Sequence, residues 1–201
     1  MAAPVEFYFE FASPYGYLAS TRIDALAAEF GRAVAWRPIM LGPMMKATGS
    51  GPLLLLQPVK GDYALRDIAR FARLLGVQLT MPEVFPLNSL AASRAYWWLV
   101  DDDPALAKRL AQAVFAAHWG EGRDMSTPAT VAEVAAPLGI VPDELLAAVT
   151  DPKIKQRLKD ETQAAADKGV FGSPFILIDS EPFWGADRLD QVRLWLQRGG
   201  W

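Results

Sequence analysis

Cysteine is absent from the 201-residue sequence, and histidine occurs only once, as His118. The lack of cysteine excludes structural disulfides, cysteine nucleophiles, thiol redox chemistry carried by the protein and cysteine-ligated metals. A Ser–His–Asp triad could use only His118, and a histidine-rich metal site is impossible, so we expect no metal. His118 falls at the end of a predicted helix, where histidine is common, and we expect it to be structural.

The chain also lacks an excess of basic charge and any long apolar run. Lys and Arg total 20 against 23 Asp and Glu, which gives a net charge of −3 at pH 7. Such a chain is a poor candidate for binding nucleic acid or an anionic membrane. Its apolar runs are far shorter than the roughly 20 residues that span a bilayer, and its start lacks the features of a signal peptide. We therefore expect a cytoplasmic protein.

Hydrophobic residues make up 52% of the sequence, enough for the packed core of one large domain or of a domain with an insertion. Residues 5–11 alternate and are aromatic, which predicts a strand. Ser13 and Pro14 are a favoured helix N-cap and first helical residue, so we expect a helix from here to Phe30. Residues 33–38 read as a second strand. The chain therefore opens with a strand–helix–strand unit that favours parallel strands.

The middle of the chain shows no strand signal. Residues 42–60 are rich in Gly and Pro and predict an irregular loop. Helical patterns follow at about 61–75, 86–100, 104–118, 128–137, 142–149 and 151–168. Three of these patterns open with a capping residue followed by a proline, at Asp103, Thr127 and Asp151.

The end of the chain returns to strands. Residues 175–179 form a short apolar strand, 181–185 its hairpin partner, and 187–197 a closing helix. A βαβ unit and a ββα unit in this order make the thioredoxin arrangement, an α/β fold. This fold has a proline, usually cis, just before its third strand, and Pro174 occupies that place.

These patterns divide the chain into two parts. We expect a thioredoxin-like domain formed by residues 1–41 and 151–201, with an all-helical domain, residues 42–150, inserted between them.

Ser13 is the first candidate functional residue, because the junction of the first strand and first helix holds the reactive group in thioredoxin-type folds. Redox members of the fold have Cys-x-x-Cys there, whereas this chain has Ser-Pro-Tyr-Gly. A serine hydroxyl cannot exchange disulfides, but it could donate a hydrogen bond to the thiolate of a ligand, aided by the helix N-terminus. The alternative is that Ser13 is only a helix cap.

Further candidates lie near the end of the chain and in the Gly/Pro-rich loop. The backbone before Pro174 could pair with an extended peptide ligand, or form a simple turn. Asp187 could hold a ligand ammonium, or cap the last helix. Loop residues at the mouth of a scaffold often bind ligands, and here the candidates are Lys46, Ser50 and Lys60.

Several segments, in order along the whole chain, carry a family resemblance. They are 7–18 (FYFEFASPYGYL), 46–49, 60–63 with Asp67 and Arg70, 85–89, 118–122, 169–174 and 183–189. Together they resemble the 2-hydroxychromene-2-carboxylate isomerases, which belong with the kappa-class glutathione transferases and the DsbA-like thioredoxin folds. The missing cysteine agrees with this resemblance.

The resemblance implies glutathione as a cofactor and a homodimer. Ser13 falls on the family's serine and would favour the glutathione thiolate as the catalytic residue. The other implied glutathione-binding residues are Ser50, Lys60, Gly172, Ser173, Pro174, Trp184, Gly185, Ala186, Asp187 and Arg188. The implied substrate-binding residues are Tyr15, Lys46 and Trp184.

The implied reaction is the cis–trans isomerisation of an aromatic carboxylate in the breakdown of naphthalene-like hydrocarbons. The thiolate adds to 2-hydroxychromene-2-carboxylate, the ring opens, the former double bond rotates, and expulsion of the thiolate gives trans-o-hydroxybenzylidenepyruvate. Two features depart from the family: Ser50 stands where many relatives have asparagine, and 51–56 is more apolar than expected. The alternatives are a kappa-like transferase with another electrophilic acceptor, and a non-catalytic module that binds glutathione or a peptide.

Overall fold

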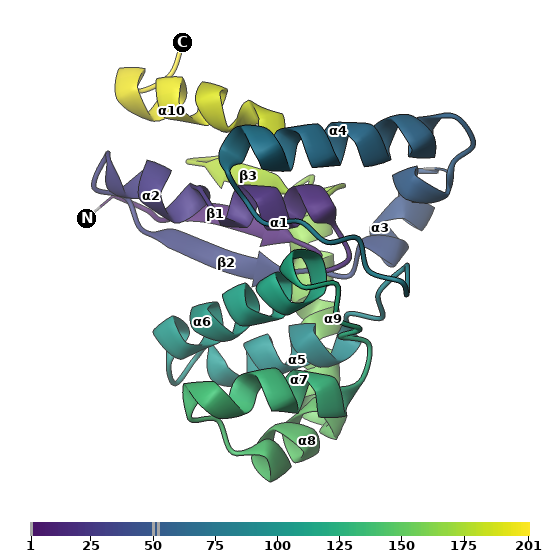
Figure 1. Cartoon of the computed structure of the whole chain (residues 1–201). Helices are drawn as coiled ribbons and strands as arrows, with labels where there is room; N and C mark the ends of the chain where they lie inside the picture. The colour runs from purple at the N-terminus through teal and green to yellow at the C-terminus, as the bar shows by residue number, and fades with distance from the viewer. Residues whose placement is uncertain (1, 50, 52) are drawn as a thin grey trace.

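A computed structural model of the chain describes residues 2–49, 51 and 53–201 (Figure 1). Its centre is a four-stranded sheet in the order β2-β1-β3-β4. β1 (Val5–Phe9) is parallel to β2 (Val34–Pro38) and antiparallel to β3 (Phe175–Ile178). β4 (Glu181–Trp184) pairs with β3 as a hairpin. The predicted βαβ and ββα units therefore share one sheet.

The first predicted helix is interrupted. α1 (Pro14–Ser20) ends before α2 (Ile23–Ala28) begins, whereas the sequence favoured one helix to Phe30. The hydroxyls of Ser20 and Thr21 donate to the carbonyls of Tyr17 and Leu18, at 2.7 and 2.8 Å. Such side-chain bonds compete with the helical backbone bonds, which explains the break.

The predicted irregular loop at 42–60 contains regular structure, so that prediction was wrong in part. α3 (Leu41–Ala47) and a 3₁₀ turn, η1 (Leu54–Leu56), lie within it. Pro43 falls in the first turn of α3, where a missing N–H costs no helical bond. Proline here begins a helix instead of ending one.

The remaining helices follow the predicted order. They are α4 (Lys60–Leu75), α5 (Leu90–Leu99), α6 (Pro104–Phe115), a π-helical turn η2 (Ala116–Gly120), α7 (Pro128–Ala135), η3 (Ala136–Leu138), α8 (Pro142–Thr150), α9 (Pro152–Asp167), η4 (Ala186–Arg188) and α10 (Leu189–Arg198). The three predicted cap–proline pairs open their helices, whereas the helix predicted from residue 86 begins only at Leu90, whose N–H donates to the Asn88 side chain. The side chains of Asp103, Thr127 and Asp151 accept N–H bonds from the first turns of α6, α7 and α9. Among the described residues, every helix falls short of the length and apolarity needed to cross a bilayer.

Helices lie on both sides of the sheet (Figure 1). α4 packs against α1 and α10 against α2, while α5, α7, α8 and α9 pack together on the other side. The middle helices thus divide between the two sides. The domain boundaries at residues 42 and 150 stay a prediction.

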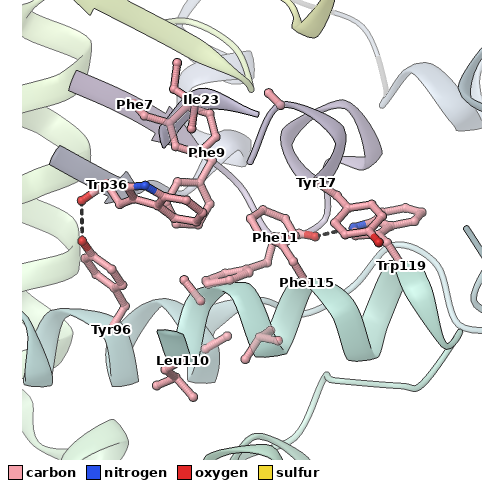
Figure 2. Close-up of a cluster of buried hydrophobic side chains, with 14 of the residues drawn as sticks. Phe7, Phe9, Phe11, Tyr17, Ile23, Trp36, Tyr96, Leu110, Phe115 and Trp119 are labelled. Carbon is pink, nitrogen blue, oxygen red and sulfur yellow. Dashed lines mark hydrogen bonds between the residues drawn. The ribbon is translucent and has the colours of Figure 1, made fainter. Parts of the chain in front are cut away.

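An aromatic core joins the sheet to the helices below it (Figure 2). Phe9 and Phe115 are fully buried with ring centroids 5.3 Å apart. The hydroxyl of Tyr96 donates to the carbonyl of Trp36 at 2.6 Å, and the indole N–H of Trp119 donates to the carbonyl of Phe11 at 2.8 Å (Figure 2). The second of these bonds fixes the segment that leads from β1 to Ser13.

Candidate functional site

A cavity of about 870 Å³ opens where β1 gives way to α1. One side, which we call the sheet side, is formed at the ends of the strands and carries most of the predicted site residues. Its residues are Ser13, Gly172, Ser173, Pro174, Trp184, Gly185, Ala186, Asp187 and Arg188. The other side, which we call the helical side, comes from α3, η1, α4 and Phe85 and is largely apolar. Its residues are Leu41, Met45, Leu53, Leu54, Leu55, Tyr63, Asp67, Ile68, Arg70, Phe71, Leu74 and Phe85.

Ser13 caps α1 and faces the proline loop. Its Oγ accepts the N–H of Gly16 at 3.0 Å and donates to the carbonyl of Ser173 at 3.0 Å. The Ser173–Pro174 bond is cis, the usual form of the proline at this position in the thioredoxin fold. Ser13 is therefore both the predicted cap and the link between two segments 160 residues apart.

Two glycines allow this close packing. A Cβ on Gly16 would lie 3.0 Å from Ser173 Oγ, which itself accepts the N–H of Glu10 at 2.8 Å. A Cβ on Gly172 would lie 2.3 Å from Nε1 of Trp184, closer than any real contact. Gly172 is thus needed for the Trp184 indole to lie against the backbone.

The segment 184–188 forms the outer edge of the sheet side. Trp184 is 56% exposed, and its ring meets that of Phe171 edge-on at 4.9 Å. Asp187 and Arg188 form an exposed ion pair at 3.4 Å. Asp187 does not cap α10, whose first turn has no side-chain cap, so this carboxylate stays at the cavity.

Tyr15 connects the two sides of the cavity. Its hydroxyl donates to Oδ2 of Asp67 on α4 at 2.7 Å. Burial, together with the neighbouring Asp67 carboxylate, raises the pKa of Tyr15 well above its usual range. Tyr15 therefore stays a neutral donor near neutral pH.

The two lysines predicted in the loop do not line the cavity as the structure describes it. Lys46 and Lys60 are exposed and are not among the described residues that line it. Ser50 lies outside the described residues. Gly51, Leu53 and Leu54 line the cavity instead, which gives the apolar segment noted in the sequence a place in the site.

Glu10 is a site residue that the sequence analysis missed. It is 7% exposed and lines the cavity, and its Oε2 accepts the N–H of Leu41 at 3.2 Å. Burial raises the pKa of Glu10, against the opposing effect of hydrogen bonds that include one from the Ser89 side chain. Its signal in the sequence was a single acid between the aromatic residues Phe9 and Phe11.

His118 lies apart from the cavity lining that the structure describes. It is 1% exposed, and Nδ1 lies 2.9 Å from the carbonyl of Arg123, so Nδ1 carries the proton. Burial lowers the pKa of His118. These contacts agree with the structural role expected for it.

The geometry can now be compared with known proteins. The family model described as DSBA-like thioredoxin domain matches residues 4–197. A solved structure of 2-hydroxychromene-2-carboxylate isomerase superposes with a TM-score of 0.89 at 31% identity, covering 96% of this chain and 94% of that one. The fold is thus the DsbA-like thioredoxin fold, as predicted.

Relatives of known name identify the family within this fold. The 2-hydroxychromene-2-carboxylate isomerase of Pseudomonas putida is 33% identical over 92% of this chain and 90% of its own length. Glutathione S-transferase kappa 1 of Homo sapiens is 25% identical over 92% of this chain and 87% of its own. The chain belongs to the 2-hydroxychromene-2-carboxylate isomerase family, a family of isomerases within the DsbA-like thioredoxin proteins.

Proposed function

We propose that this protein is a glutathione-dependent isomerase that interconverts 2-hydroxychromene-2-carboxylate and trans-o-hydroxybenzylidenepyruvate in the breakdown of naphthalene-like aromatics. The observation that supports this proposal most strongly is the composition of the cavity. The hydroxyl of Ser13 and the backbone of Ser173 meet on one side, and an apolar surface for an aromatic ring faces them. The relatives named as 2-hydroxychromene-2-carboxylate isomerases also support this function.

The residues of the sheet side fit glutathione. A tripeptide needs backbone partners, a carboxylate for its ammonium group and a donor for its sulfur. The proline loop at Ser173, the Asp187 carboxylate and the Ser13 hydroxyl line one cavity and offer these groups. The cavity of about 870 Å³ falls within the usual range for small-molecule sites, so it has room for a cofactor and an acceptor.

When bound, glutathione supplies a thiolate that adds reversibly to the conjugated double bond and so removes the barrier to rotation. Ser13 would hold the sulfur through its hydroxyl, and hydrogen bonding to the charged form would favour the thiolate. That hydroxyl donates to the carbonyl of Ser173 in the free protein. A ligand amide that pairs with this carbonyl would release the Ser13 proton for the sulfur. The apolar helical side would place hydrophobic surface beside the reacting atoms.

The first test is a calorimetric titration of the full chain with reduced glutathione, with S-methylglutathione as the control. We expect saturable binding that prefers the free thiol. Equal binding of both compounds would contradict a thiolate site at Ser13. No binding up to millimolar concentration would overturn the proposal.

The second test is a product assay with 2-hydroxychromene-2-carboxylate and glutathione. Conversion to the trans product with glutathione regenerated is expected. A persistent conjugate would instead support a kappa-like transferase, which the apolar helical side would also suit. Binding of glutathione without turnover of this or any other electrophile would leave a binding module. A homodimer and a cytoplasmic location stay predictions, and light scattering would test the dimer.

A further inference from the structure

One face of α4 lines the helical side of the cavity. Tyr63, Asp67, Arg70 and Leu74 follow one another at spacings of four, three and four residues and all border the cavity. Such spacing places side chains along one face of a helix. α4 lies at the upper right of the molecule in Figure 1, above α1. We call these four residues the α4 stripe.

The guanidinium of Arg70 is held within the α4 stripe. Nη2 donates to Oδ1 of Asp67 and, at 3.3 Å, to the hydroxyl of Tyr63. The guanidinium carbon lies 5.9 Å from the centre of the Tyr63 ring. The other oxygen of Asp67 accepts the hydroxyl of Tyr15. Asp67 therefore orients Arg70 from one side and is itself fixed to α1.

The described residues engage only one nitrogen of this guanidinium. Nη1 and Nε of Arg70 have no hydrogen-bond partner in the part of the chain that the structure describes. The only other basic side chain among the described cavity residues, Arg188, pairs with Asp187 on the sheet side. On the helical side Arg70 is thus the one cation with unused donors among the described lining residues. The Nη1 and Nε groups can each donate a hydrogen bond to a carboxylate oxygen, and the guanidinium stays charged at neutral pH.

We propose that Arg70, oriented by Asp67 and Tyr63, binds the carboxylate of an aromatic acid whose ring packs against the apolar helical side. The proposal rests on the proposed function for the place of the substrate. It deepens that function by assigning the anionic group of the substrate to the α4 stripe. Phe71 and Leu74, which also line the cavity, provide apolar surface beside the cation.

Within the α4 stripe, the positive charge of Arg70 balances the negative charge of Asp67, so binding of a carboxylate there depends on Arg70. Without its guanidinium, the Asp67 carboxylate would face the bound carboxylate alone, and like charges repel. Removing Arg70 would thus add repulsion to the loss of a hydrogen bond. Arg66, on the same helix, is exposed and is not among the cavity residues, so it is a matched control.

The test is calorimetric titration of the full chain with 2-naphthoate and with the neutral 2-naphthamide, neither of which reacts with thiols. Each is titrated with and without saturating reduced glutathione. We expect the wild type to prefer the carboxylate, and Arg70→Met to lose about tenfold in naphthoate affinity while keeping its affinity for naphthamide. Arg66→Met should behave as the wild type, and Arg70→Lys should keep part of the preference.

Several outcomes would overturn the proposal. They are a wild type without preference for naphthoate, an Arg70→Met variant that keeps the preference, and an Arg70→Met variant that loses glutathione affinity instead. If the wild type fails to bind glutathione, the proposed function fails. The naphthoate preference measured without glutathione still decides the role of Arg70.

Discussion

The two sides of the cavity are built in different ways. On the sheet side, the Ser13 hydroxyl donates to the carbonyl of Ser173, and the Ser173 hydroxyl accepts the backbone N–H of Glu10. On the helical side, large apolar side chains such as Leu54 and Leu74 stand exposed, at 42% and 79%. Hydrogen-bonded backbone fixes atoms more narrowly than apolar contact does. We infer that the sheet side sets the chemistry, whereas the helical side selects the acceptor and tolerates substitution.

The largest effect is expected from Ser13→Ala on the sheet side. Loss of the hydroxyl removes the donor that we propose for the glutathione sulfur, and loss of one such donor typically lowers turnover by about 100-fold or more. The variant also loses the cap of α1, which costs about 1 kcal/mol of stability. Steady-state kinetics and urea unfolding measure the two effects separately.

Thr127→Ala is the matched control for this variant. Thr127 caps α7 by accepting the N–H of Thr130, and it is not among the described cavity residues. It should lose similar stability and keep full turnover. If Ser13→Ala also kept full turnover, Ser13 would be a helix cap and nothing more.

Gly172→Ala tests the outer part of the sheet side. Its Cβ would meet the Trp184 indole at 2.3 Å, so the ring must leave its position. We expect glutathione affinity to fall about tenfold, the effect of one lost contact, measured by calorimetry. Gly42→Ala is the control, because a Cβ there meets nothing within 4 Å. Unchanged affinity in Gly172→Ala would mean that Trp184 takes no part in binding.

Leu54→Ser tests the helical side, where a smaller effect is expected. Leu54 is already 42% exposed, so only part of its apolar contact can be lost. KM for the aromatic substrate should rise about three- to tenfold, with glutathione affinity unchanged. Leu65→Ser, 41% exposed on α4 and not among the described cavity residues, is the control. A fall in glutathione affinity would show that the two sides do not act separately.

The sequence predicted the two sides unequally. Ser13, Ser173 and Pro174 could be placed because local signals, a cap–proline pair and a proline before a strand, coincide with the ends of the sheet. Lys46 and Lys60 were chosen because they lie in or beside the Gly/Pro-rich loop and match the family resemblance. In the structure, α3 and α4 leave both side chains exposed and outside the described cavity lining.

Residues that meet only through tertiary packing could not be predicted as a group. Asp67 and Arg70 were noted only through family resemblance, since the bond between Tyr15 and Asp67 depends on how α4 packs on α1. The break between α1 and α2 was missed because Ser20 and Thr21 carry no strong helix-ending signal.

Glu10 contacts residues on both sides of the cavity. Its replacement by glutamine should have the smallest effect on ligand binding, and its effect on the free energy of unfolding should depend on pH. Its Oε2 accepts the N–H of Leu41 at 3.2 Å, and burial raises its pKa. The folded protein therefore holds this proton more tightly than the unfolded chain does. The resulting stability is fully present below the ordinary pKa of 4.5 and is lost as pH rises through the raised value.

Glu10→Gln cannot titrate, so the wild type should lose stability relative to this variant as pH rises from about 4.5 towards 7. Each unit of pKa shift corresponds to about 1.4 kcal/mol. Urea unfolding across this range measures the difference, and Glu83→Gln, at an exposed carboxylate that is not among the described cavity residues, controls for the change in net charge. A difference between wild type and Glu10→Gln that stays constant with pH would show that Glu10 is charged alike in both states. Glu10 would then be an ordinary carboxylate that backbone N–H groups hold between the two sides of the cavity.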